Sequence, residues 1–210
     1  MTRTYALASV ALIGVLIAGT AAAIFVSRAG DDDQFSQCRQ GVVAGGAGTI
    51  GGPFSLVNGA GETVTDVDVI TEPTLVYFGY TFCPDVCPLD TVRNAEAVDI
   101  LEESGNIVQP VFITLDPNRD TPEVMAAFTE NVHERMLGLT GTEEQTHAAA
   151  SAYRVYYQIN DDGTDPYYLV DHTAFTYLML PEVGFVDFFS RNVTPAEMAQ
   201  RTACFIDAAS

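Results

Sequence analysis

A continuous apolar segment, a helical segment and a second apolar segment follow one another in the middle of the chain, and this succession restricts the possible folds strongly. Thr74–Gly79 contains residues that favour strands, and its unbroken apolar character indicates a strand buried on both faces. Val108–Leu115 has the same character. Between them, apolar residues recur every three or four positions, which is typical of an amphipathic helix that ends near Ser104. The recurring positions are Leu89, Val92, Ala95, Val98 and Leu101. A strand, helix and strand in this order imply a parallel strand pair with a right-handed crossover.

Four more segments are predicted to be strands, in pairs before and after this unit. Phe54–Val57 and Glu62–Thr65 flank the sequence Asn-Gly-Ala-Gly, which is a hairpin signal. Thr173–Leu180 and Gly184–Phe189 are joined by Pro-Glu-Val and are interpreted as two adjacent strands.

Three further helices are indicated by their N-terminal signals. Thr121 precedes Pro122, which suits the first position of a helix running to about Val132. Thr142 and Thr194 each begin a capping box and open two more helices, one central and one terminal. A β-α-β unit followed by a hairpin and a terminal helix is the order of a thioredoxin-like domain. We therefore predict an α/β, thioredoxin-like domain with an N-terminal hairpin extension and an added central helix.

The N-terminus is predicted to be a membrane segment. Residues 5–26 form a run of 22 residues without charge, and a helix needs about 20 such residues to cross a bilayer. A cleaved signal peptide, cut near Thr20–Ala23, is the alternative, but signal cores usually have about 7–15 apolar residues, so an uncleaved anchor is favoured. Both interpretations export the rest of the chain.

The chain is therefore divided into residues 1–28 as the anchor, 29–50 as a flexible linker rich in glycine and acids, and 51–210 as the folded domain. We place the N-terminus in the cytoplasm, because the opposite topology would keep the paired cysteines reduced inside the cell. The prediction is a single-pass protein of the cell inner membrane with its C-terminal domain in the periplasm, or an equivalent exported compartment.

Charge excludes one class of partner and suggests another. The 210 residues include 28 acids and nine bases, all arginine, for a net charge of −19. This balance excludes nucleic-acid binding as the main activity, because that binding depends on positive charge. From Asp31 onward there are seven arginines against 28 acids, so this part carries −21. Such a domain should be steered towards a basic patch on a protein partner.

The chemistry is predicted to lie at Cys83 and Cys87, between the first buried strand and the following helix. Ligands bind beyond the carboxyl ends of strands in open α/β sheets, so a site is expected there. Two cysteines four residues apart would share one face of a helical turn, and a helix N-terminus stabilises thiolates. Such a pair can form a disulfide or hold a soft metal, whereas two structural core cysteines are the less favoured interpretation. A structural zinc site would need about four ligands, and the other two cysteines are remote in sequence. A structural zinc site is therefore not favoured.

A third ligand is sought among the three histidines. His133 and His147 are interpreted as surface residues of helices. His172 is placed at the start of the strand beginning at Thr173, beside the cysteine loop, with Asp171 as a residue that could orient its ring. Two thiolates and one imidazole suit copper, because thiolates select Cu(I) and imidazole also accepts Cu(II).

The sequence resembles the Sco/SenC family of copper-delivery proteins for cytochrome c oxidase. The resemblance rests on blocks in family order between about residues 51 and 190, above all Cys-Pro-Asp-Val-Cys-Pro and the downstream Asp-His. The remaining blocks are 51–56, 77–82, Asp116–Pro122, 138–142, 152–157 and 177–178. This resemblance implies a thioredoxin-like fold, one N-terminal anchor, and Cys83, Cys87 and His172 as copper ligands. It also implies a role in assembling the dinuclear copper centre of oxidase subunit II, with an upstream copper donor.

Two alternative activities are retained. A thiol–disulfide oxidoreductase that reduces the oxidase cysteines would need Cys83 and Cys87 but not His172, although the usual motif is C-x-x-C. A peroxidase-like enzyme is weaker, since nothing in the sequence brings Arg119 and Thr121 near Cys83.

Two cysteines lie outside the motif. Cys38 and Cys204 are an even number of leftover cysteines in an exported domain, which suggests a disulfide that would join the linker to the terminal helix. Two unpaired cysteines without a special role are the alternative. The acid-rich turn Asn160–Asp165 lacks the EF-hand layout and is interpreted as a solvated turn.

Overall fold

The structure is a computed structural model that describes residues 19–20, 34–39, 50–161, 163 and 167–210. The chain divides into two compact units, Met1–Cys38 and Arg39–Ser210. The expected anchor over 1–28 and linker over 29–50 lie outside the described residues, except for the short pieces just given. In the described part of the chain, no helix has the length and apolar character needed to cross a membrane.

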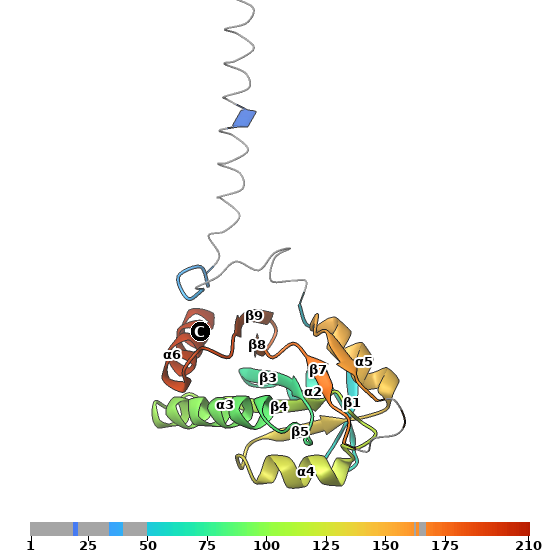
Figure 1. Cartoon of the computed structure of the whole chain (residues 1–210). Coiled ribbons are helices and arrows are strands. Elements are labelled where there is room, and N and C mark those ends of the chain that lie inside the picture. The colour runs from blue at the N-terminus through green and yellow to red at the C-terminus, as the bar shows by residue number, and fades with distance from the viewer. Residues whose placement is uncertain (1–18, 21–33, 40–49, 162, 164–166) are drawn as a thin grey trace, which may run out of the picture. The chain divides into compact units, whose positions relative to one another are not determined.

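A seven-stranded mixed sheet organises the second unit (Figure 1). Its strand order is β2-β1-β5-β4-β3-β8-β9, and a separate sheet pairs β6 with β7. The strands are β1 Ser55–Asn58, β2 Thr63–Thr65, β3 Thr74–Gly79, β4 Gln109–Thr114, β5 Leu137–Thr140, β6 Tyr157–Ile159, β7 Val170–His172, β8 Thr176–Leu180 and β9 Gly184–Phe189. Strands β3, β4 and β5 run parallel, whereas β8 joins β3 antiparallel and turns back into β9. The predicted β-α-β unit and the predicted hairpins at both ends are therefore present.

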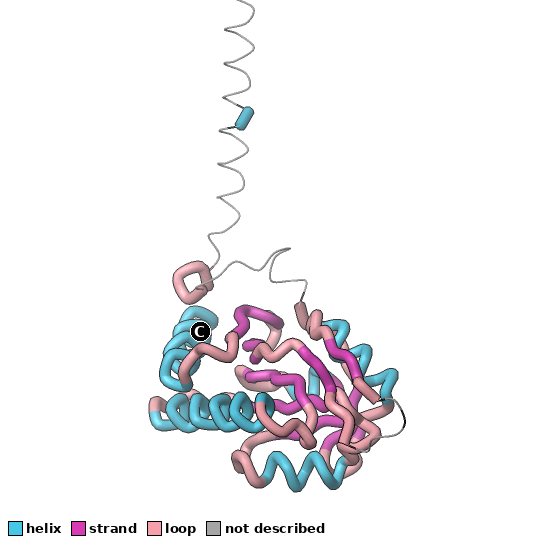
Figure 2. Tube along the Cα trace, viewed as in Figure 1, coloured by secondary structure: helices cyan, strands magenta, loops and turns pink. Residues whose placement is uncertain are grey.

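Among the described residues of the second unit, the helices are α2 Asp66–Val69, α3 Val86–Glu103, α4 Pro122–Glu130, α5 Glu143–Ala152 and α6 Pro195–Ala209. Helix α3 packs against α6, and α4 and α5 pack against the β5 and β1 part of the sheet, as the cyan helices around the magenta strands in Figure 2 show. Strand β3 is the centre of the core, because all six of its residues are buried.

The predicted helix caps are formed. The Thr121 hydroxyl accepts a hydrogen bond from the amide of Val124, and Thr194 does the same for Glu197. Thr142 forms both halves of a capping box with Gln145. Side-chain caps of this kind satisfy amides at helix starts that have no partner within the helix.

Most boundaries differ from the sequence-based expectation by two residues or fewer, and two differ by three. Helix α3 begins at Val86, earlier than the apolar periodicity indicated, because its first turn contains Cys87 and Pro88 in place of a regular apolar face. Strand β8 begins at Thr176 and not at Thr173.

The small β6–β7 sheet was not anticipated and places His172. The two strands are antiparallel, with Tyr157 opposite His172 and Ile159 opposite Val170. The prediction that His172 starts the strand leading to Leu180 is therefore wrong. His172 ends β7, because residues 170–172 pair with a segment that lies more than ten positions earlier in the chain.

Candidate metal centre

The two cysteines lie where the central strand gives way to a helix. Strand β3 ends at Gly79, a loop follows, and α3 begins at Val86, so Cys87 belongs to the first helical turn and Cys83 to the loop. The prediction that both share one turn of a helix is wrong in this respect. The Cys87 amide instead donates to the Cys83 sulfur over 3.3 Å, so the helix N-terminus points at that sulfur.

Both cysteines are free thiols and both are buried. Cys87 is fully buried at 0% exposure, whereas Cys83 retains 8%. Gly79 makes room for the Cys87 side chain, because a Cβ at position 79 would lie 3.0 Å from the Cys87 sulfur and 3.0 Å from a ring carbon of Tyr77. The sulfurs are thus set into the core and not displayed on the surface.

His172 completes the cluster. Its Nε2 lies 3.3 Å from the Cys87 sulfur, and the ligand atoms of Cys83, Cys87 and His172 all lie within 4.8 Å of one another. The three residues that the sequence singled out are therefore brought together by the fold.

The other ring nitrogen fixes the orientation of His172. Nδ1 lies 3.1 Å from the backbone oxygen of Thr173, and a carbonyl can only accept, so Nδ1 donates and Nε2 is the ring nitrogen that faces the Cys87 sulfur. Asp171, predicted to orient the ring, does not do so. Its carboxylate accepts from the Asn160 side chain at 2.9 Å, because alternate residues of a strand face opposite sides.

Two tyrosines enclose the imidazole. The rings of Tyr77 and Tyr80 meet the His172 ring edge to face, with centroids 6.3 and 6.2 Å apart. Both tyrosines are buried, so the imidazole packs against two aromatic rings of the core. Tyr77 and Tyr80 lie in the block at residues 77–82, yet nothing in their spacing predicted that they would pack against the His172 ring.

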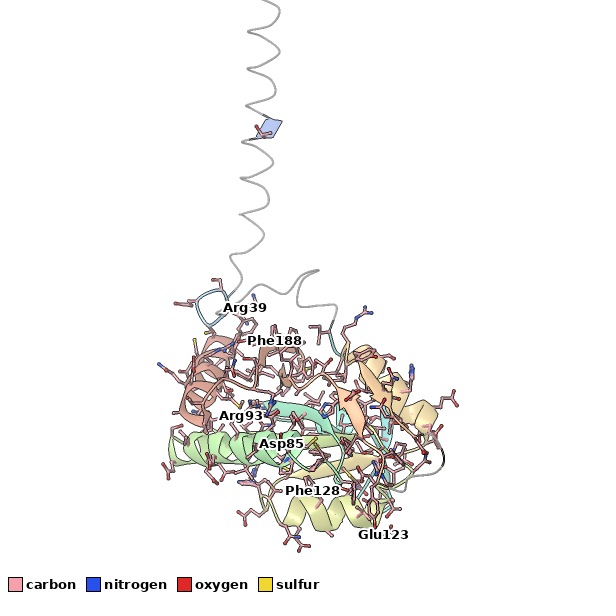
Figure 3. All side chains as sticks on the ribbon, in the orientation of Figure 1. Arg39, Asp85, Arg93, Glu123, Phe128 and Phe188 are labelled. Carbon is pink, nitrogen blue, oxygen red and sulfur yellow. The ribbon has the colours of Figure 1, made fainter. Side chains whose placement is uncertain are left out.

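A buried polar group lies behind Tyr77. The Tyr77 hydroxyl donates to Asp90 over 3.2 Å, and the carboxylate of Asp90 lies 3.4 Å from Arg93 and 3.5 Å from Arg191. Asp90 is 3% exposed, so its charge is compensated by these two arginines rather than by water. Figure 3 labels Arg93 along α3 and Asp85 at the start of that helix.

The two sulfurs differ electrostatically. A hydrogen bond from the Cys87 side chain, helped by His172 and the Cys87 amide, lowers the pKa of Cys83 to about 3 against the opposing effect of burial. The neighbouring Cys83 sulfur, and after it burial, raises the pKa of Cys87. At neutral pH the pair therefore holds one proton, with Cys83 as the thiolate and Cys87 as the thiol.

The remaining histidines and cysteines lie elsewhere. His147 is exposed, as predicted, whereas the His133 side chain is 8% exposed and its Nε2 lies 3.2 Å from Asp99, so its assignment to the surface is wrong. Cys38 and Cys204 are each disulfide-bonded.

The donor set suits a soft metal. Two sulfurs and an imidazole nitrogen converge beside core residues, and thiolate with imidazole is the ligand chemistry that copper accepts in both oxidation states. Without a metal, the same two sulfurs can exchange electrons as a dithiol and a disulfide.

Comparison with known proteins agrees with this reading. A family model described as SCO1/SenC matches residues 43–207. Protein SenC of Rhodobacter capsulatus is 51% identical over 207 residues, which cover 99% of this chain and 92% of that protein. The mitochondrial SCO1 homolog 1 of Arabidopsis thaliana is 44% identical over 155 residues, and the match covers 73% of this chain but only 46% of that relative. The crystal structure of Arabidopsis thaliana ScoI with copper bound superposes with a TM-score of 0.70 at 39% identity, covering 75% of this chain and 99% of that one.

Proposed function

The chain belongs to the SCO1/SenC family, and on that basis we propose that it is a copper metallochaperone whose ligands are Cys83, Cys87 and His172. Its recipient is the dinuclear copper centre of cytochrome c oxidase subunit II, and an upstream copper donor loads it. The observation that carries the proposal is the convergence of two sulfurs and Nε2 within 4.8 Å.

Copper is the cargo of this reaction, and the residues have different parts in holding it. The two sulfurs supply the soft donors that Cu(I) prefers, and the Nε2 lone pair of His172 adds the donor that extends binding to Cu(II). Loading displaces the proton held by the thiol of Cys87, because a thiol binds metal as the thiolate. Transfer proceeds by ligand exchange with a facing site on the partner.

The proposed setting is a cell inner membrane, with residues 1–28 as a single anchor, 29–50 as a linker and 51–210 as a periplasmic domain. The uncharged run over residues 5–26 supports the anchor, because its 22 residues match the thickness of a bilayer. The acidic charge of the exported part supports a recipient with a basic docking surface.

Copper and thiol stoichiometry of the purified full chain, before and after reduction, tests this function. We expect one copper per chain and its loss in the Cys83→Ser/Cys87→Ser double variant. The matched control is Cys38→Ser/Cys204→Ser, which changes the same number of sulfurs and should retain copper. Equal copper content in the two double variants would refute the assignment.

A second function, thiol–disulfide reductase chemistry on the oxidase cysteines, is favoured by the thiolate character of Cys83. Reduction of an oxidised peptide carrying the oxidase copper-site cysteines would distinguish the two. Equal rates for the unmodified chain and His172→Ala would favour the reductase, because electron exchange between sulfurs does not need the imidazole.

A further inference from the structure

The segment between β4 and α4 lies against both halves of the candidate site. Its residue Arg119 places the guanidinium carbon 3.6 Å from the ring centroid of Tyr168, 5.0 Å from that of Phe82 and 5.7 Å from that of Tyr80. The sequence indicated only a turn between a strand and a helix here. The structure instead shows one cation in contact with three aromatic rings.

Asp116 fixes the guanidinium over the nearest ring. Its carboxylate pairs with Nε of Arg119 and also accepts from the Tyr168 hydroxyl over 2.7 Å. Asp116 has no exposed surface, and the Arg119 side chain is 19% exposed. One buried carboxylate thus holds both the cation and the ring on which the cation stacks, so this contact is more rigid than a surface ion pair.

The rings under Arg119 belong to the two segments that carry the ligands. Phe82 adjoins Cys83 in the loop after β3. Tyr80 of the same loop packs edge to face against the His172 ring, with ring centroids 6.2 Å apart. Tyr168 lies two residues before β7, the strand that ends in His172. Arg119 therefore connects the cysteine loop with the histidine strand.

The cysteine loop has its own anchor in the same segment. Asp120, also without exposed surface, accepts from the Thr81 amide over 3.0 Å and from the Thr114 hydroxyl over 2.6 Å. The carboxylate of Asp120 thus ties the cysteine loop to β4. His172 belongs to the β6–β7 sheet, which is separate from the seven-stranded sheet in the described part of the chain. The strand that carries His172 therefore depends more on the contact with Arg119 for its position than the cysteine loop does.

We propose that Arg119 is a positioning residue that holds the histidine strand against the cysteine loop and so supports the binding of Cu(II) selectively. This inference rests on the proposed function, since it concerns copper at the same site. Cu(I) binding by the two sulfurs depends little on where His172 lies, whereas Cu(II) binding requires the imidazole in place. A change that loosens the strand therefore separates the two affinities.

The test compares the full-length chain with Arg119→Lys and Arg119→Ala. Competition titrations measure the Cu(I) and Cu(II) affinities, and amide hydrogen exchange of the metal-free proteins reports on residues 167–173. Changes in the groups that orient metal ligands typically cost about 10- to 100-fold in affinity, so we expect a loss of that size for Cu(II) and less than about threefold for Cu(I). Exchange over residues 167–173 should become faster in both variants.

Arg135→Lys and Arg135→Ala are the matched controls. Arg135 is also a partly buried arginine, paired with Glu72 at 2.7 Å and Glu102 at 3.0 Å, near the ends of β3 and α3 remote from the cysteines. These variants should leave both copper affinities and the exchange of residues 167–173 unchanged. Tyr168→Phe keeps the ring and should retain most of the Cu(II) affinity, whereas Tyr168→Leu should reproduce the Arg119→Lys loss.

Parallel losses of Cu(I) and Cu(II) affinity, or no loss in Arg119→Lys, would overturn the positioning role. Unchanged amide exchange in metal-free Arg119→Lys would overturn it as well, whatever the copper results. Failure of the unmodified chain to bind copper would instead refute the proposed function, so the two failures are distinguishable. If Arg119→Ala does not fold, Arg119→Lys and Tyr168→Leu still decide the question.

Discussion

The two halves of the candidate site are built in different ways. The cysteine half extends from β3, whose six residues are all buried, and Cys87 itself has no exposed surface. The histidine half lies on a three-residue strand whose only ladder partner in the described chain is β6, also of three residues. One half shares the stability of the core, whereas the other depends on a short strand pairing, on ring contacts and on the guanidinium of Arg119.

This difference has a thermodynamic meaning. Local stability in a protein ranges from almost nothing at weakly supported segments to the full free energy of unfolding in the core. The cysteine pair should therefore lose its geometry only when the domain unfolds. The position of His172 can be lost while the domain remains folded, and changes of copper affinity without changes of stability should come from that half.

The largest effect should come from removing the imidazole. We expect His172→Ala to reduce Cu(II) affinity by at least about a hundredfold, because changes beyond the ligands alone already cost about 10- to 100-fold. Cu(I) affinity should change far less, and the urea midpoint should stay close to that of the unmodified chain. His147→Ala, at an exposed histidine, is the control. A similar drop for both oxidation states would mean that the two halves are not separable.

A change on the cysteine half should act on stability. In Gly79→Ala, the new methyl would meet the Cys87 sulfur and a ring carbon of Phe112 at 3.0 and 3.1 Å, so the core must shift. Overpacking of this kind costs about 1–3 kcal/mol in the free energy of unfolding, measurable by urea denaturation. Cu(I) and Cu(II) affinities should fall together. Gly52→Ala, whose Cβ would have ordinary contact at 3.4 Å, should have little effect.

The two cysteines should differ in reactivity. A pKa of about 3 leaves Cys83 as the thiolate at every pH above that value, so its alkylation rate should be nearly constant from about pH 5 to pH 8. An ordinary thiol, with a pKa of about 8.5, would react about tenfold more slowly for each unit of falling pH. Cys87, whose pKa is raised, should react at least about tenfold more slowly than Cys83. Mass spectrometry of the alkylated, metal-free chain measures both rates, and preferential labelling of Cys87 would contradict the assignment.

The smallest effect is expected at Asp171. Its carboxylate contacts Asn160 and not the imidazole, so Asp171→Asn should change Cu(II) affinity by less than about twofold, within the scatter of ordinary surface changes. A Cu(II) titration of His172→Ala in parallel shows how large a loss of affinity is when the imidazole is absent. A large loss would show that the aspartate, and not the Thr173 carbonyl, orients the ring.

Local patterns predicted the elements that are long or buried on both faces. The bounds of Thr74–Gly79 and Gly184–Phe189 agree with the structure, because continuous apolar character or strand-forming residues leave few alternatives. Strand β5 was not predicted. It has four residues, and Gly138 within it weakens the strand signal. That glycine is required because α4 packs closely, with a Cβ at position 138 only 3.0 Å from the Met125 carbonyl oxygen.

The site was predictable only in part for a related reason. The spacing of Cys83 and Cys87 and the strand before them are local features, and they identified the cysteine half. The surroundings of His172 depend on the pairing of β6 with β7, and the location of Arg119 depends on rings from two distant segments. Contacts of this kind join residues that are far apart in the chain, and no periodicity in one segment encodes them.

The graded burial of the three ligands gives the site a direction. Cys87 is sealed in the interior, while Cys83 and the half-buried His172 lie closer to the outside. An incoming donor atom can therefore approach the cargo only from the outer side, where it replaces the imidazole and the Cys83 sulfur first. We expect the bond between copper and the Cys87 sulfur to break last. A transfer complex trapped midway should therefore still contain that copper–sulfur bond.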